Sequence, residues 1–297
     1  MHMADALVSP AVGGTMWAAT AGTTALACRR VRQGLDDRRV PLMGVLGSFV
    51  FAAQMVNFQV PGTGSSGHLG GALLLAILLG PHAAFVVVTS VLAIQALFFG
   101  DGGLLALGCN AFNIGFFPAF VAYPLVYRPL AGPGAGPGRR TAASLLAAAT
   151  GLCLGAFGVV LETTASGITE LPFRLFLGAM VPIHLAIAVV EGLATAAVVG
   201  FVLKVRPDVV EPGPAAPTPT SRLGAVFLAA ALVLGGFVSW FASRQPDGLE
   251  WSIAKVTGRP ATAEENAGRA ATTLAGIGGG LATLVLVGGA GWALRRR

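Results

Sequence analysis

The chain has 297 residues, of which 55% are hydrophobic and only 11% are charged. An ordinary soluble domain carries about 25% charged residues, and several uncharged runs here reach the roughly 20 residues that cross a bilayer core. This composition excludes a typical soluble protein. Because no water reaches the core, the backbone must satisfy its own hydrogen bonds, and continuous apolar runs do so as helices. The sequence therefore predicts an all-α integral membrane protein.

Nine apolar runs follow one another along the chain, and each is expected to be a membrane span. They cover 10–28, 40–58, 68–80, 81–99, 109–127, 141–161, 183–203, 223–242 and 272–293. The third run is short, and Gly80-Pro81 separates it from the fourth because proline cannot continue a helix. The segment 172–182 is apolar but carries Arg174, so we expect an interfacial or re-entrant lead into the seventh run.

A stretch rich in proline and charge, residues 204–222, interrupts these runs and is typical of a linker. It predicts a seven-helix bundle over 1–208, a cytoplasmic linker at 209–221 and a two-span unit over 222–297. The two-span unit would carry an outer loop at 243–271.

The distribution of Lys and Arg predicts the orientation, because cytoplasmic connections carry the excess of basic residues. With the N-terminus outside and the C-terminus in the cytoplasm, 14 of the 19 basic residues fall on the inner side. The net charge of +6 then reflects membrane topology, and nucleic acid is not expected as a partner.

The start of the chain offers an unusual set of metal ligands. The α-amine of Met1, the ionised backbone amide of His2 and the His2 imidazole place three nitrogens nearly in one plane. The first basic residue, Arg29, follows the first apolar run, so no signal peptide is expected and the amine would stay free. His68 lies on the same outer side and could supply a fourth nitrogen. Square-planar nitrogen ligation suits Ni(II) or Cu(II), whereas Zn(II) prefers tetrahedral sites.

Each of these histidines also has a simpler interpretation. A histidine at position 2 usually has no special role, and His68 could be a helix-start residue that donates to a loop carbonyl. The sequence thus leaves a structural role open for both.

Polar side chains inside apolar runs are costly and often functional. Gln54 and Asn57 lie three residues apart at the outer end of the second run, and Asn110 and Asn113 repeat that spacing in the fifth. They could orient the metal-binding histidines as outer-shell partners or form hydrogen bonds between helices. Glu191 is expected on the same helix face as His184, paired with a polar group in the bundle or with a partner subunit.

Nucleotide-binding, hydrolase and flavin motifs are absent from the sequence, so an enzyme is not expected. The outer loop 62–69 superficially matches a phosphate loop, but it has a histidine and a leucine where Lys and Ser/Thr are needed.

The motifs together resemble the substrate-capture subunits of nickel/cobalt energy-coupling factor (ECF) transporters, the CbiM/NikM family. The resemblance covers residues 1–208 and is carried by the Met1-His2 start, VNFQVPGTGSSGHLGGALLLAILLGP at 56–81 and HLAIAVVEGLAT at 184–195. It implies a chelate at Met1, His2 and His68 and a helical bundle with an extra N-terminal span. It also implies a transmembrane coupling (T) subunit and two cytoplasmic ATPase subunits as partners in the cell membrane. The transported substrate would be Ni(II) or Co(II), with no catalytic cofactor.

The second unit resembles the PDGLE domain, a small two-span accessory component of such transporters. The resemblance is carried by residues 246–251, PDGLEW. It implies that the outer loop helps to load metal into the capture subunit. Two alternatives remain at this stage, which are capture of another small substrate such as a vitamin, and a non-transport membrane scaffold or intramembrane enzyme. Nickel and cobalt are not separated by the sequence, although an ionised amide favours nickel.

Overall fold

The computed structural model describes residues 2–34, 39–132, 134–211, 220–260 and 268–296. Three sequence predictions therefore fall partly outside the described residues: the role of Met1, most of the linker 209–221, and positions 261–267 of the outer loop.

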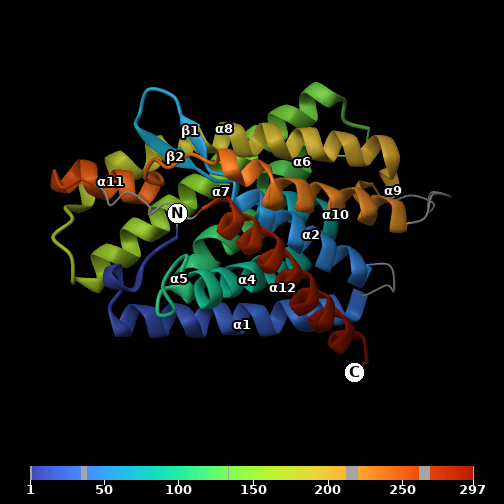
Figure 1. The fold of residues 1–297 in the computed structure, drawn as a ribbon, viewed down its shortest axis with the longest axis horizontal. Helices are drawn as coiled ribbons and strands as arrows, with labels where there is room; N and C mark the ends of the chain where they lie inside the picture. The colour runs from blue at the N-terminus through green and yellow to red at the C-terminus, as the bar shows by residue number, and fades with distance from the viewer. Residues whose placement is uncertain (1, 35–38, 133, 212–219, 261–267, 297) are drawn as a thin grey trace.

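Helices make up most of the described chain (Figure 1). The α-helices are α1 (Pro10–Gly34), α2 (Arg39–Gln54), α3 (Ala72–Leu79), α4 (Pro81–Ile94), α5 (Leu107–Asn110), α6 (Arg128–Leu130), α7 (Pro137–Ser166), α8 (Phe173–Val205), α9 (Pro207–Val210), α10 (Thr220–Gly236), α11 (Gly248–Thr257) and α12 (Arg269–Arg296). Two π-helical segments, η2 (Gln95–Phe99) and η3 (Ala111–Tyr127), continue α4 and α5, and short 3₁₀ turns lie at η1 (Asp5–Leu7) and η4 (Val238–Phe241).

Six helical segments within the described ranges are long and apolar enough to cross a membrane. They are Pro81–Phe99, Leu107–Leu130, Pro137–Ser166, Phe173–Val205, Ser221–Phe241 and Arg269–Leu294. The prediction of an all-helical, multi-pass membrane protein is confirmed. The predicted number of nine spans is not, since α1 is not among the six and the apolar part of α2, Val40–Gln54, is shorter than the others.

The third predicted span, already short in the sequence, is shorter still in the structure. Residues 68–71 are not helical, and α3 has only eight residues, all buried. At 1.5 Å per residue, α3 covers roughly 12 Å, which is less than half of a hydrocarbon core of about 30 Å. The sequence showed that this run is short, but hydropathy alone could not reveal that protein encloses the whole of α3.

Of the two alternatives for the segment 172–182, interfacial or re-entrant, the re-entrant one is wrong. Residues 173–205 form one continuous helix of 33 residues, α8, with Arg174 exposed near its start and Pro182 inside it. A proline within a membrane helix is tolerated where neighbouring groups satisfy the backbone it frees. The charge of Arg174 therefore marks the end of a long helix and not a break in the chain.

The second predicted span ends earlier than expected, at Gln54, and a small hairpin follows it. Strand β1 (Phe58–Val60) pairs antiparallel with β2 (Ser65–Gly67), and Phe58 faces Gly67 across the ladder. Asn57 therefore lies outside the helix, and the expectation that Gln54 and Asn57 share a helix face is incorrect. The glycines Gly62 and Gly64, both with positive φ, let the chain turn within this hairpin.

The two C-terminal helices pack directly on the N-terminal bundle, with α10 and α12 lying along α2 (Figure 1). Small residues let these helices approach closely. A Cβ built at Gly276 of α12 would lie 2.1 Å from the carbonyl oxygen of Gly235 in α10, and one at Gly279 would lie 2.0 Å from the ring of Phe51 in α2. The two predicted units thus share an extensive interface.

Candidate metal centre

The N-terminal segment is held in place through the main chain of Met3. The amide nitrogen of Met3 donates to Oδ1 of Asn110 at 2.7 Å, and its carbonyl accepts from Nδ2 of the same side chain at 3.1 Å. The amide of Gly103 donates to that carbonyl as well, at 2.9 Å. Met3 is fully buried. One asparagine thus binds both backbone groups of residue 3 and fixes where residue 2 lies.

Asn113 extends this anchor by one turn. Its Nδ2 lies 4.0 Å from the sulfur of Met3 and donates to Glu162 of α7 at 2.6 Å. Asn110 and Asn113 therefore face the same N-terminal segment, as expected from their spacing on one helix.

The rings of His2 and His68 stack on one another, with centroids 4.8 Å apart and planes inclined by 14°. Nδ1 of His2 lies 3.2 Å from Oδ1 of Asp101. Nδ1 of His68 lies 3.1 Å from the carbonyl oxygen of Leu69, which can only accept, so this nitrogen carries the proton. Two residues 66 positions apart in the sequence are thus brought into ring contact.

Both imidazoles are neutral at physiological pH. Burial is the main cause, and it lowers the pKa of His2 and the pKa of His68 to about 3. Burial also raises the pKa of Asp101, the acidic neighbour of His2. A metal ligand must be deprotonated, and these two side chains already meet that requirement.

The buried carboxylate of Glu191 holds the loop that carries His68. Oε2 of Glu191 accepts from the amide of Gly70 at 2.7 Å, and Oε1 accepts from the amide of Gly71 at 2.9 Å. Successive backbone N–H groups of this kind form an anion-binding nest. Gly71 has φ +74°, and a Cβ there would lie 2.6 Å from Val50, so the turn requires glycine.

Gln54 also holds this loop, and Gln95 in turn holds Gln54. Nε2 of Gln54 donates to the carbonyl of Gly70 at 2.9 Å, and Nε2 of Gln95 donates to Oε1 of Gln54 at 2.8 Å. Gln54 thus acts on the His68 loop through the backbone.

The PDG segment of the C-terminal unit lies against the hairpin. The carbonyl of Pro246 accepts from the amide of Ser66 at 2.8 Å, and Nε1 of Trp251 donates to the carbonyl of Thr63 at 2.8 Å. The amide of Ser243 donates to the carbonyl of Asn57 at 2.7 Å, so the described contact of Asn57 is made by its main chain.

Asp247 begins α11 with a capping box. Its carboxylate accepts from the amides of Leu249 and Glu250, while the Glu250 side chain accepts from the amide of Asp247. Burial alone would raise the pKa of Asp247, whereas the hydrogen bond from the Glu250 amide stabilises the carboxylate, and the net effect of its surroundings is a lowered pKa. Asp247 therefore presents an anionic side chain next to the histidines.

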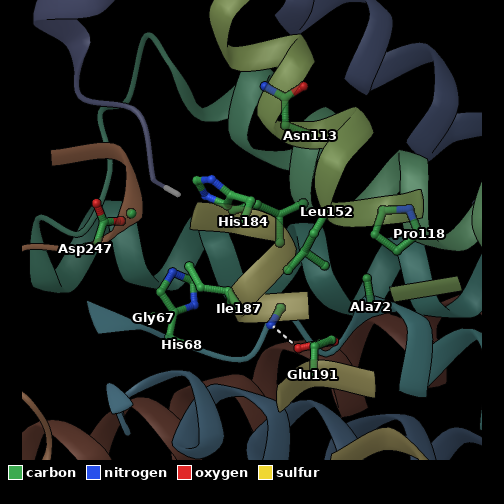
Figure 2. Close-up of a pocket in the computed structure, with 13 residues that line it drawn as sticks. Gly67, His68, Ala72, Asn113, Pro118, Leu152, His184, Ile187, Glu191 and Asp247 are labelled. Carbon is green, nitrogen blue, oxygen red and sulfur yellow. Dashed lines mark hydrogen bonds between the residues drawn. The ribbon is translucent and has the colours of Figure 1, made fainter. Parts of the chain in front are cut away.

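Two hollows meet at the histidines. An outer cleft is lined by His2, Asp101 and residues of the C-terminal unit, and an inner cavity is lined by His184, Glu191 and Gly248. His68 and Asp247 line both. Figure 2 shows the rings of His68 and His184 and the carboxylate of Asp247 around the same part of the inner cavity.

Sequence reasoning did not assign Asp101, Asp247, Gln95 or His184 to the site. His184 and Asp247 belong to recognised motifs, but the sequence does not show that they line the same cavity. Within the described ranges, no group of three His, Cys, Asp or Glu side chains is arranged to hold a metal. Met1, whose amine belongs to the predicted chelate, lies outside the described residues.

Residues 2–209 match the family model described as the cobalt uptake substrate-specific transmembrane region, CbiM. The chain belongs to the CbiM family. Residues 221–269 match the PDGLE domain, so the chain is a CbiM region fused to a PDGLE domain.

The relatives match either nearly the whole chain or about 70% of it. The fused nickel transport protein NikMN of Rhodobacter capsulatus is 33% identical over 296 residues, which cover 95% of this chain and 82% of that protein. The cobalt transport protein CbiM of Geobacter sulfurreducens is 33% identical over 219 residues, 70% of this chain and 61% of that protein. The crystal structure of a truncated transition metal transporter matches with a TM-score of 0.61 and 31% identity, and the match covers 69% of this chain and 99% of the other.

Proposed function

We propose that this chain is the substrate-specific membrane component of an ECF-type ABC importer and that it captures Ni(II) or Co(II) outside the cell membrane. The observation that carries the proposal is the stacked pair of neutral imidazoles, His2 and His68, at the inner end of the outer cleft. Membership of the CbiM family and the names of nickel and cobalt transport relatives support the same substrate class.

In the proposed site the metal binds the α-amine of Met1, the ionised amide and Nδ1 of His2, and an imidazole nitrogen of His68. Nδ1 of His2 is the nitrogen that closes a six-membered chelate ring with its own amide. It lies 3.2 Å from Asp101 in the described structure, so metal binding would displace that carboxylate. Four nitrogens in a square favour nickel over zinc.

Gln54, Asn110 and Asn113 act in this proposal as outer-shell partners. Asn110 and Asn113 fix the N-terminal segment through Met3, and Gln54 fixes the loop of His68 through Gly70. Asn57 contributes through its carbonyl to the docking of the C-terminal unit.

The chain would work with a transmembrane coupling subunit and two cytoplasmic ATPases, which supply the energy for uptake. The N-terminus would face outside and the C-terminus the cytoplasm, in keeping with the excess of basic residues on the inner connections. No catalytic step is assigned to the chain itself. The PDG segment would close the outer side of the site, because Asp247 and Gly248 line the cavity next to His68.

The decisive experiment measures Ni(II) affinity of purified protein whose first residue has been verified by intact mass. Adding one residue before Met1 moves the amine away from His2 and should abolish tight binding, whereas the same residue added at the C-terminus should not. His68→Ala should weaken binding by more than the roughly 10–100-fold that the loss of an outer-shell partner costs. Unchanged affinity in the N-terminally extended protein would refute the chelate. Displacement of nickel by a vitamin would refute metal as the substrate.

A further inference from the structure

His184 is a buried histidine with one ring nitrogen unused. The residue is 1% exposed on α8, and its Nδ1 lies 2.8 Å from the carbonyl oxygen of Met180. A carbonyl only accepts, so Nδ1 carries the proton and Nε2 bears a lone pair. Nε2 is buried, and no hydrogen-bond partner for it lies among the described residues. Burying such an acceptor without a partner is unfavourable, so an occupant that satisfies it would stabilise the site.

The surroundings of His184 favour a cation as that occupant. Asp247 and Glu191 line the same cavity as His184, and the carboxylate of Glu191 forms part of its wall (Figure 2). Gly248 packs against the ring, since a Cβ there would lie 3.1 Å from Cε1 and 3.3 Å from Nε2 of His184. A larger side chain at position 248 would fill the space next to Nε2.

The orientation of the ring is the one that metal-binding histidines adopt. Such histidines usually donate their other ring N–H to a carbonyl or carboxylate, which fixes the tautomer and orients the lone pair. The carbonyl of Met180 does this for His184. Neutral imidazole is a ligand that suits nickel and other late first-row divalent metals.

The inner cavity also connects with the outer cleft. His68 and Asp247 line both hollows, one residue from each unit, and they form the boundary between them. We propose, on the basis of the function proposed above, that Nε2 of His184 is an inner binding position for the transported divalent cation, reached from the outer chelate past His68 and Asp247. The cation passes from the nitrogen ligands in the outer cleft, which include His2 and His68, to the imidazole of His184 within the bundle.

The chain contains only four histidines, which permits an unambiguous test. The variant His2→Ala/His68→Ala/His82→Asn, prepared as the full chain without a polyhistidine tag, keeps His184 as its only histidine. Co(II) is added to saturation, and X-ray absorption is used to count imidazole ligands. We expect one imidazole per bound cobalt. Absence of imidazole scattering would overturn the proposal and leave a buried water molecule as the partner of Nε2.

A second arm isolates Nε2. His184→Asn is added to the same variant. It keeps an N–H group that can reach the carbonyl of Met180 but removes the Nε2 lone pair that would bind the metal. We expect Co(II) affinity to fall at least about tenfold, by analogy with the loss of other metal-site partners. Unchanged affinity would overturn the proposal. The matched control is the single substitution His82→Asn in the otherwise unaltered chain. His82 lies outside both hollows, so this variant should bind metal as the unaltered chain does.

These results are separable from the test of the outer chelate. If the N-terminal extension leaves nickel affinity unchanged, the outer chelate fails, whereas the single-histidine variant reports on His184 alone. Circular dichroism and thermal melts of each variant verify that the helices remain folded. Where His184→Asn fails to fold, the imidazole count in the single-histidine variant decides the question.

Discussion

A single carboxamide determines where the first residues of the chain lie. The side chain of Asn110 accepts from the amide of Met3 and donates to its carbonyl. Because His2 is the residue next to Met3, its position is fixed as well. The sequence predicted that Asn110 either orients the histidines or forms hydrogen bonds between helices, because a polar side chain inside an apolar run needs a partner. Its partner could not be predicted, because a main-chain group leaves no pattern in the sequence. Asn57 was expected within the second helix, but α2 ends at Gln54. The turn that ends it does not change the hydropathy of the run.

Replacing Asn110 by alanine should release Met3 and loosen the N-terminal segment. We expect Ni(II) affinity to fall by about 10–100-fold, as for the loss of other outer-shell partners, while the fold persists. Competition with a coloured chelator measures the affinity. Thr150→Ala, on α7 and bonded only within its own helix, is the control. Equal affinities in the two variants would show that Met3 need not be anchored.

The proposed ligands also predict the number of protons released on metal binding. His2 and His68 are neutral well above their pKa of about 3, so neither releases a proton at pH 7. A free α-amine ionises near pH 8, and the amide must lose its proton as well. We expect release of roughly two protons per metal at pH 7, falling to about one at pH 9, so affinity rises with pH. Calorimetry in buffers of different ionisation enthalpy counts them, and no release at pH 9 would contradict an ionised amide.

At the scale of elements, the long helices were predictable and the loop that carries His68 was not. Runs of apolar residues specify α7, α8, α10 and α12 because lipid and protein both favour them. The hairpin and the short α3 depend on contacts with α8 and with the PDG segment, which lie more than 100 residues further along the chain. Their sequence is rich in glycine, and only the structure distinguishes a glycine needed for a close approach from one needed only for a turn.

Gly71 and Gly62 allow this distinction to be measured. Both have positive φ, so alanine is strained at either position by about 1–2 kcal/mol. At Gly71 the new Cβ also meets Val50 at 2.6 Å, whereas at Gly62 there is open space. Gly71→Ala should therefore cost about 1–3 kcal/mol more than Gly62→Ala, with a lower melting temperature in detergent. Equal melting temperatures would mean that the loop moves away from Val50 without cost.

At the scale of the whole molecule, the composition of the connecting segment predicts two units, and the CbiM and PDGLE family models match on either side of it. The way in which they join was not predictable. Glycines are spread throughout α12, and the sequence gives no sign that Gly276 meets the backbone of α10 while Gly278 faces open space. The close approach of α10, α12 and α2 is a property of three-dimensional packing.

Gly276→Ala and Gly278→Ala form a matched pair on one helix. A Cβ at position 276 would lie 2.1 Å from the carbonyl oxygen of Gly235, a backbone atom that cannot rotate away. We expect Gly276→Ala to separate α12 from α10 and to lower the melting temperature by several degrees, consistent with about 1–3 kcal/mol of overpacking. Gly278→Ala should be neutral or slightly stabilising, because alanine favours helices. Comparable melting behaviour of the two would contradict the packing described for α10 and α12.

The bond from Trp251 to the carbonyl of Thr63 has a consequence for stoichiometry. The PDG segment and the hairpin belong to one polypeptide, so their docking is intramolecular and depends on an effective concentration that a short tether sets in the millimolar range. A contact of a few hydrogen bonds, too weak to hold two free proteins together at cellular concentrations, is then sufficient. A PDG segment that detached would stay tethered and could not be lost by diffusion, so each chain carries one such segment for each hairpin.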